Sequence, residues 1–182
     1  MATYQEIKGG KLKNYTEDPD NPYIGQLWYN TTVHGFRIRK NTLSSSWSSG
    51  GNLNTARKNN SGAGTSTAAL TFAGRVPAAR ALTEAYNGST WTEVNDLNLA
   101  RGSGQAGGTY TSAILMGGAV DPPVNAQVET WNGTNWTEVA DLNTARYDGG
   151  GAATDSTNSL VFAGYGTADS ALTESWNGSS WT

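Results

Sequence analysis

The chain has 182 residues, a formal net charge of −3 and no cysteine. The missing cysteine excludes a disulfide framework, a thiolate metal site and a cysteine nucleophile. Abundant glycine and tryptophan, 23 and 7 residues, disfavour long helices and favour strands, turns and aromatic packing. No apolar run approaches the roughly 20 residues that span a bilayer, and no signal peptide is visible, so we expect no membrane insertion.

Charge is divided unevenly along the chain. Residues 1–46 contain six Lys and Arg against four Asp and Glu, whereas the remainder contains six against eleven. Nucleic-acid binding needs a basic surface. The acidic remainder therefore argues against a nucleic-acid partner.

The first 46 residues show no internal repeat and are predicted to form a β-hairpin module. "DPDNPYIG" is a proline-rich turn, and "GQLWYNTTVHGFRIRK" predicts strands at 26–30 and 36–40. Trp28, Phe36 and Ile38 are the expected apolar contacts, and together with Tyr29 they are the predicted anchoring residues. Two strands alone are marginal in water. The hairpin therefore needs a partner, which could be the rest of the chain, another copy or a larger assembly.

One pattern in this segment resembles a known module. "P-x-x-G-Q-L-W-Y-N-T-T…F-R-I-R" is similar to a short module near the N-terminus of bacteriophage virion proteins, notably tail-fibre and particle-surface proteins. The resemblance implies that residues 1–46 attach to other virion proteins and that the repeats project outward.

From residue 47 onward the chain repeats with a period of about 45 residues. "YNGSTWTEVNDLNLAR" at 86–101 returns as "WNGTNWTEVADLNTAR" at 131–146, and "WNGSSWT" starts a third copy at 176. A period of this length indicates a repeat architecture. The recurring positions are Trp47, Trp91, Trp136 and Trp181; Arg57, Arg101 and Arg146; and Glu84, Glu129 and Glu174.

Each unit predicts four short strands. "AALTFAG" reads as a buried strand, "LTEAYNGSTWTEV" as a hairpin turning at Asn87-Gly88, and the small-residue stretch before each apolar run as a strand close to its neighbours. The fold class is therefore all-β, with four-stranded units the size of propeller blades. Repeat bounds are expected at about 47–90, 91–135 and 136–182.

An apolar run ending in glycine, an aromatic residue, a Trp and "L-x-x-A-R" together resemble the kelch motif over about residues 43–182. The resemblance implies a β-propeller of four-stranded blades. The chain departs from the motif twice: only the middle repeat has the full Gly117-Gly118, and the interval from the aromatic residue to the Trp is short. Three repeats make an incomplete ring. Further blades in a longer product, several chains sharing one ring, or an open array would each account for it.

The repeated residues have two interpretations each. Trp recurring at one place is expected to pack between units, the alternative being a ligand-stacking platform. Glu84, Glu129 and Glu174 are expected to meet Arg57, Arg101 and Arg146 in ion pairs within or between units, the alternative being that both partners are exposed.

Residues suited to catalysis are scarce. His34 is the single histidine and lies outside the repeats. A Ser–His–Asp triad, a zinc site and the histidine-ligated copper site of kelch-type oxidases are therefore not expected, and neither is any cofactor. Asp121, Asp148, Asp155 and Asp169 could touch Ca²⁺ but match no standard calcium loop, so solvated acids are the expectation.

These observations predict a non-enzymatic structural and attachment protein of a bacteriophage particle, located in the virion as a tail fibre or capsid-surface appendage. Homo-oligomers are expected. The alternative is a glycan-binding lectin or adhesin that contacts host-surface sugar through a loop aromatic such as Tyr110 or Tyr165. Host, receptor, head or tail location and blade count are left open.

Overall fold

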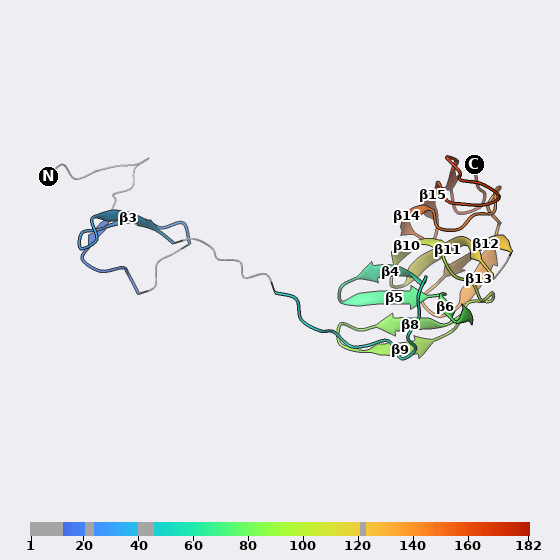
Figure 1. Cartoon of the computed structure of the whole chain (residues 1–182), viewed down its shortest axis with the longest axis horizontal. Coiled ribbons are helices and arrows are strands. Elements are labelled where there is room, and N and C mark those ends of the chain that lie inside the picture. Colours follow the sequence, from blue (N-terminus) through green and yellow to red (C-terminus); the bar gives the residue numbers. More distant parts are fainter. Residues whose placement is uncertain (1–12, 21–23, 40–45, 121–122) are drawn as a thin grey trace. The chain divides into compact units, whose positions relative to one another are not determined.

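A computed structural model describes residues 13–20, 24–39, 46–120 and 123–182, in which every regular element is a β-strand. Among these residues no helix could cross a membrane. The chain divides into two compact units, Met1–Ser48 and Ser49–Thr182, close to the boundary expected after residue 46 (Figure 1).

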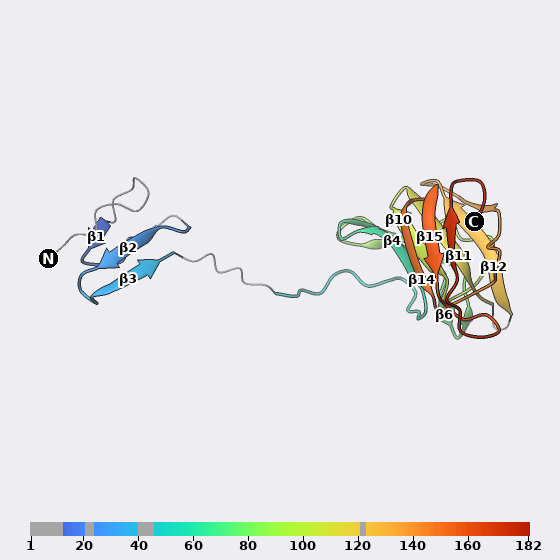
Figure 2. The same ribbon diagram turned by 90° about the horizontal axis from the view of Figure 1, so that it is seen from above.

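The first unit contains a three-stranded sheet. Its strands are β1 (Lys13–Tyr15), β2 (Leu27–Asn30) and β3 (Gly35–Ile38), in the order β1-β2-β3 (Figure 2). The predicted hairpin is β2-β3, which is antiparallel, and β1 adds a parallel strand on its other edge. The predicted strand end at residue 40 lies outside the described residues. The extra strand meets part of the need for a partner, because three strands are more stable than two.

The described part of the second unit contains three antiparallel sheets of three or four strands, one for each repeat, and one two-stranded ribbon. The first sheet is β4 (Ser61–Thr65), β5 (Ala68–Phe72), β8 (Thr83–Tyr86) and β9 (Trp91–Val94), and the short ribbon β6 (Arg75–Val76) and β7 (Ala78–Ala79) lies between β5 and β8 in the chain. The second sheet is β10 (Gln105–Thr109), β11 (Ser112–Ala119), β12 (Val124–Trp131) and β13 (Trp136–Val139). The third sheet is β14 (Gly150–Asp155), β15 (Asn158–Phe162) and β16 (Thr173–Trp176), and Trp181 adds an isolated bridge to Trp176.

The repeat bounds predicted at 90/91 and 135/136 are wrong in phase. Trp91 pairs with Tyr86, and Trp136 pairs with Trp131, so each predicted bound cuts a hairpin that belongs to one sheet. A sequence period fixes the length of a repeat but not its starting point, because hydrogen bonds between strands decide which strands share a sheet.

The first strands of the three sheets lie next to one another. β10 contacts both β4 and β14, and small residues allow the close approach. A Cβ added at Gly107 would meet Ala153, and one added at Gly151 would meet Ala106. This arrangement of small antiparallel sheets is consistent with a propeller-like fold, and the described residues close no ring.

The tight turns depend on positive φ angles. Gly88, Gly133 and Gly178 have φ near +90°, as the Asn-Gly pairs predicted, but each loop has four residues rather than two because the Asn side chain takes part. In the first of these loops, the Asn87 side-chain oxygen accepts hydrogen bonds from the backbone N–H groups of Ser89 and Thr90. The result is a tight tip on each outer hairpin.

Candidate functional site

The repeated acidic residue of each sheet is held by the segment that leads into that sheet. Glu84 lies on β8, Glu129 on β12 and Glu174 on β16. The holding segments have the pattern Leu-Asn-x-Ala-Arg and span residues 53–57, 97–101 and 142–146. We call each of these assemblies a carboxylate clamp.

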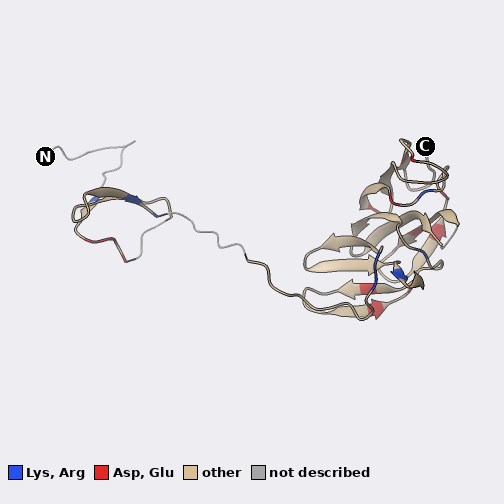
Figure 3. Cartoon of the chain, viewed as in Figure 1, with Lys and Arg blue, Asp and Glu red and all other residues tan. Residues whose placement is uncertain are grey.

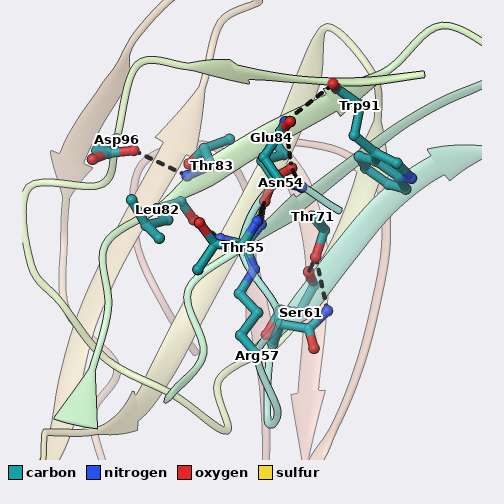
Figure 4. A network of polar contacts seen from close by, with 11 residues as sticks. Asn54, Thr55, Arg57, Ser61, Thr71, Leu82, Thr83, Glu84, Trp91 and Asp96 are labelled. Atoms are coloured by element: carbon teal, nitrogen blue, oxygen red, sulfur yellow. Dashed lines mark hydrogen bonds and ion pairs between the residues drawn. The ribbon is translucent and has the colours of Figure 1, made fainter. Parts of the chain in front are cut away.

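The first clamp shows how the segment is bound (Figure 4). The backbone N–H and the side-chain amide of Asn54 donate to Glu84 Oε2 over 2.7 and 2.9 Å, and Thr55 N–H donates to Oε1 over 3.4 Å. Arg57 Nη2 pairs with the same Oε1 at 2.9 Å. The Asn54 amide also donates to the Trp91 carbonyl on the neighbouring strand. One carboxylate therefore ties a loop, an arginine and two strands together.

The second clamp repeats this geometry. Glu129 accepts from the Asn98 N–H at 2.7 Å, the Asn98 amide at 2.9 Å, the Leu99 N–H at 3.3 Å and Arg101 Nη1 at 2.6 Å. Both charged side chains are buried, Arg101 completely. The predicted ion pair is present here, and the exposed alternative is wrong for this pair.

The third clamp keeps the same core. Glu174 accepts from the Asn143 N–H at 2.7 Å, the Thr144 N–H at 3.2 Å and Arg146 Nη2 at 2.5 Å. Arg146 also donates to the Leu172 carbonyl at 2.8 Å. All three predicted Glu–Arg pairs are therefore formed and buried.

Electrostatics in the clamps are dominated by burial. Burial lowers the pKa of Arg57 and Arg101, and the Glu84 and Glu129 carboxylates oppose that shift. Arginine nevertheless stays protonated in proteins. Each carboxylate accepts hydrogen bonds from backbone N–H groups and from a permanent cation. The arrangement suits fixing a loop.

The repeated tryptophans occupy three different environments. Trp136 is 6% exposed, donates through its indole N–H to Thr83 Oγ1 of the first sheet at 3.0 Å, and meets the Phe72 ring edge-on at 4.7 Å. Trp181 is buried in a cluster with Ile114 and Met116 of the second sheet. These two residues pack between neighbouring sheets.

The other two tryptophans differ from that prediction. Trp91 is half-buried and stacks on Tyr86 at 4.9 Å, both from the first sheet. Trp47 is 102% exposed, so its predicted packing role is wrong. Among the described residues no strand lies next to residue 47 in the chain. The predicted equivalence of Trp47 to the other tryptophans rested on sequence spacing alone.

The N-terminal sheet separates the predicted anchoring residues onto two faces. Tyr29 pairs with Phe36, and Leu27 pairs with Ile38, so these four side chains share one face. Phe36 and Ile38 are 56% and 52% exposed. Trp28, in contrast, is buried on the opposite face.

Asp18 explains the position of Trp28. Its carboxylate accepts from the Asn30 amide at 2.8 Å and from the Trp28 indole at 3.0 Å. Both hydrogen bonds lower the pKa of Asp18, and the bond from Asn30 has the larger effect. Sequence reasoning missed Asp18 because a carboxylate ten residues from its partner carries no local pattern.

The remaining candidates do not gather into one site. Tyr110 lies in the β10–β11 turn, whereas Tyr165 follows the far end of β15, so the two tyrosines lie at opposite ends of equivalent strands. Among the described residues no group of His, Asp or Glu could hold a metal ion. Asp155 accepts from the Thr157 hydroxyl and N–H, which lowers its pKa, and Asp121 lies outside the described residues.

The clamp asparagines are functional residues that the sequence analysis did not assign. Asn54, Asn98 and Asn143 recur with the same period as the Arg and Glu. Their signal was present in the repeated "LN", which entered the repeat pattern only as L-x-x-A-R, with no role given to the Asn. Each Asn donates its backbone N–H to the carboxylate at 2.7 Å.

Comparisons with known proteins give a fold and no family. No family model matches the chain, and no curated protein matches it. Among solved structures the chain is similar to one titled "Structure of YjhT", with a TM-score of 0.58 and 12% identity over 82% of this chain and 48% of that one. The chain thus spans about half the length of that structure, and a likeness at this identity extends to the all-β fold alone.

Proposed function

We propose that the protein is a non-enzymatic structural and attachment component of a bacteriophage particle, with its N-terminal sheet as the anchor. The three sheets then serve as kelch-like blades of an incomplete propeller that presents loops to a host or a partner. The proposal combines the phage-like pattern at 22–39 with the repeat pattern at 43–182.

The observation that carries the proposal is the apolar face of the first unit. Leu27, Phe36 and Ile38 are all more than a third exposed, and they lie beside one another on adjacent strands. Contiguous exposed apolar side chains mark interaction sites. The face belongs to a unit that is compact by itself, as an anchoring module requires.

The second unit supports a presenting role rather than a catalytic one. Its buried carboxylates are engaged in the clamps, and much of its ribbon carries neither acidic nor basic residues (Figure 3). Hydrogen-bonded acids of this kind hold loops in place. They supply the rigidity that a projecting surface needs.

Particle binding tests the proposal. The full chain should co-sediment with purified particles at a fixed stoichiometry, and the variant with Phe36→Asp and Ile38→Asp should lose that binding. Val33→Asp is the matched control, because Val33 is 53% exposed in the same hairpin but lies in its turn. Equal binding by all three proteins, or none by the unaltered chain, would contradict the anchoring role.

Glycan binding is a second candidate function, favoured by the exposure of Tyr110 and Tyr165, 36% and 41%. Tyr165 is also supported edge-on by Tyr147 at 5.6 Å, a fixed platform for stacking on a sugar. A glycan array should show binding that Tyr165→Ala removes. Because the two tyrosines lie at opposite ends of the strands, Tyr110→Ala should not remove the same binding.

A further inference from the structure

Neighbouring sheets meet at two internal seams, and the same contacts recur at both. A glycine N–H donates to the carbonyl of the next clamp arginine, a leucine N–H donates to an alanine carbonyl, and a loop N–H donates to the carbonyl of its equivalent one repeat earlier. The pairs are Gly74–Arg101 and Gly118–Arg146 at 2.9 Å, Leu97–Ala81 and Leu142–Ala126 at 3.0 Å, and Ser103–Asn59 and Asp148–Ser103 at 2.8 and 3.0 Å. A seam is therefore a defined set of donors, acceptors and packed side chains.

The third sheet presents one half of another seam. Ile114 and Met116 of the second sheet are fully buried against the third, yet their equivalents Leu160 and Phe162 are 42% and 41% exposed. Leu172 beside them is 55% exposed.

The backbone hydrogen bonds of this face are also incomplete. Gly164 is equivalent to Gly74 and Gly118, and its N–H has no partner among the described residues. Ala171, the equivalent of Ala81, lines an open hollow of about 720 Å³ together with Ser170 and Leu172. At the internal seams the corresponding space receives the clamp segment of the next sheet.

The first sheet presents the complementary half. Trp91 is half-buried, and its indole N–H has no partner in the part of the chain that the structure describes, whereas Trp136 and Trp181 both donate. Leu53 is half-buried, although its equivalents Leu97 and Leu142 are buried. These residues match the free half on the third sheet.

We propose that the free face of the third sheet binds the first sheet of a second copy of this chain, so that two copies join head to tail at two equivalent seams. The Gly164 N–H of one copy then donates to the Arg57 carbonyl of the second copy. The Leu53 N–H of the second copy donates to the Ala171 carbonyl of the first. The second copy's Trp91 covers Leu160 and Phe162. This inference rests on the sheet packing and not on the attachment role.

Three arguments select a second copy as the occupant. The contacts continue an interface that the chain already makes twice with its own repeats. Charge is also complementary, because Asp148, whose N–H is used at the second internal seam, is exposed, and exposed Lys58 precedes Asn59, the expected neighbour of Asp148 at the new seam. Two copies of the three described sheets supply six, within the roughly four to eight blades of known propellers, whereas three copies of them would supply nine.

The mass of the full chain in solution is the first test. Sedimentation velocity at concentrations up to about 100 µM, enough to saturate a micromolar interface, should show a species of twice the 19.2 kDa chain mass. A monomer throughout that range would overturn the proposal and leave the face for a sheet from a different chain.

Complementary variants test the head-to-tail geometry. Leu160→Asp with Phe162→Asp damages one half of the seam, and Trp91→Ala with Leu53→Asp damages the other. Each variant alone should be monomeric, and their equimolar mixture should dimerise through the one seam left intact. Ser89→Asp and Ser179→Asp, in exposed turns of the same two sheets, are matched controls and should remain dimeric. A mixture that stays monomeric would overturn the geometry.

A cross-link keeps the test decisive if a charged variant misfolds. The chain has no cysteine, so Leu53→Cys chains mixed with Ala171→Cys chains can form only engineered disulfides. Residues joined by a backbone hydrogen bond lie within disulfide reach. The mixture should give a disulfide-linked heterodimer on oxidation, well above the homodimer yield of either variant alone. Equal yields would count against the seam.

Discussion

Replacing Glu129 with alanine should destabilise the second unit strongly. Glu129 is 1% exposed and accepts four hydrogen bonds, two of them from the backbone of the segment before β10. Without it, the buried Arg101 guanidinium loses its counterion, and its Nε and Nη2 already lack partners among the described residues. Leaving a buried charge unpaired costs about 3–5 kcal/mol.

A matched control separates this effect from the loss of any acidic side chain. Glu138 stands directly opposite Glu129 on the neighbouring strand but is exposed. Glu138→Ala should therefore change the free energy of unfolding by less than about 0.5 kcal/mol. The comparison holds residue type, sheet and sequence region constant while burial and pairing differ.

Urea unfolding followed by tryptophan fluorescence measures both variants. A loss of 3–5 kcal/mol would also lower the melting temperature by roughly 3 °C per kcal/mol for a unit of this size. Replacing both Arg101 and Glu129 with methionine should recover only part of the loss, because no charge is left buried but the Asn98 and Leu99 N–H groups still lose their acceptor. A melting shift for Glu129→Ala no larger than that for Glu138→Ala would refute the clamp as a source of stability.

Three further predictions follow from other contacts. Trp136→Ala should cost about 3–5 kcal/mol by urea unfolding, because it opens a cavity between two sheets, whereas Trp91→Ala should cost less than half as much in dilute solution. Gly117→Ala should cost roughly 1–3 kcal/mol in the same assay, because φ is +60° there and the new methyl would overlap a backbone carbonyl. The Asp18 carboxyl, followed by NMR, should titrate below 3.8, and Asn30→Ala should move the midpoint back toward that value. Since the folded pKa is lowered, the stability that Asp18 contributes is present above 3.8 and is lost as the pH falls through the folded pKa.

The repeat pattern was informative because it reports on contacts that are made once per unit. Glu129 and Arg101 recur at a fixed spacing, and alternation along a strand put the Glu on one face, so their meeting could be predicted from the sequence. The burial of the pair could not be predicted, because it depends on the clamp segment folding back over the sheet. The backbone N–H groups that Asn98 and Leu99 donate to Glu129 could come from any residue type except proline, so the sequence does not mark them as donors.

Spacing failed where it was extended beyond the sheets. Trp47 fits the tryptophan period as well as Trp136 does, yet it is fully exposed. A side chain is buried only where another part of the chain packs over it, and sequence periodicity does not show whether such a part is present. The same limit hid β1, since a three-residue parallel strand that pairs with β2 has no hydrophobic pattern of its own.

The hydrogen bonds of the clamps explain why charged and polar side chains lie between apolar sheets. A buried ion pair is weak evidence for stability, since an apolar pair can do as well. The carboxylate of Glu129, however, binds the N–H groups of Asn98 and Leu99 in sequence, which fixes the register of the segment as well as its presence. That register sets the Arg101 carbonyl opposite the Gly74 N–H of the preceding sheet at 2.9 Å. Each clamp therefore positions the hydrogen-bonding groups of the seam with the preceding sheet. A sheet with an intact clamp presents these groups in the geometry that an equivalent sheet can bind.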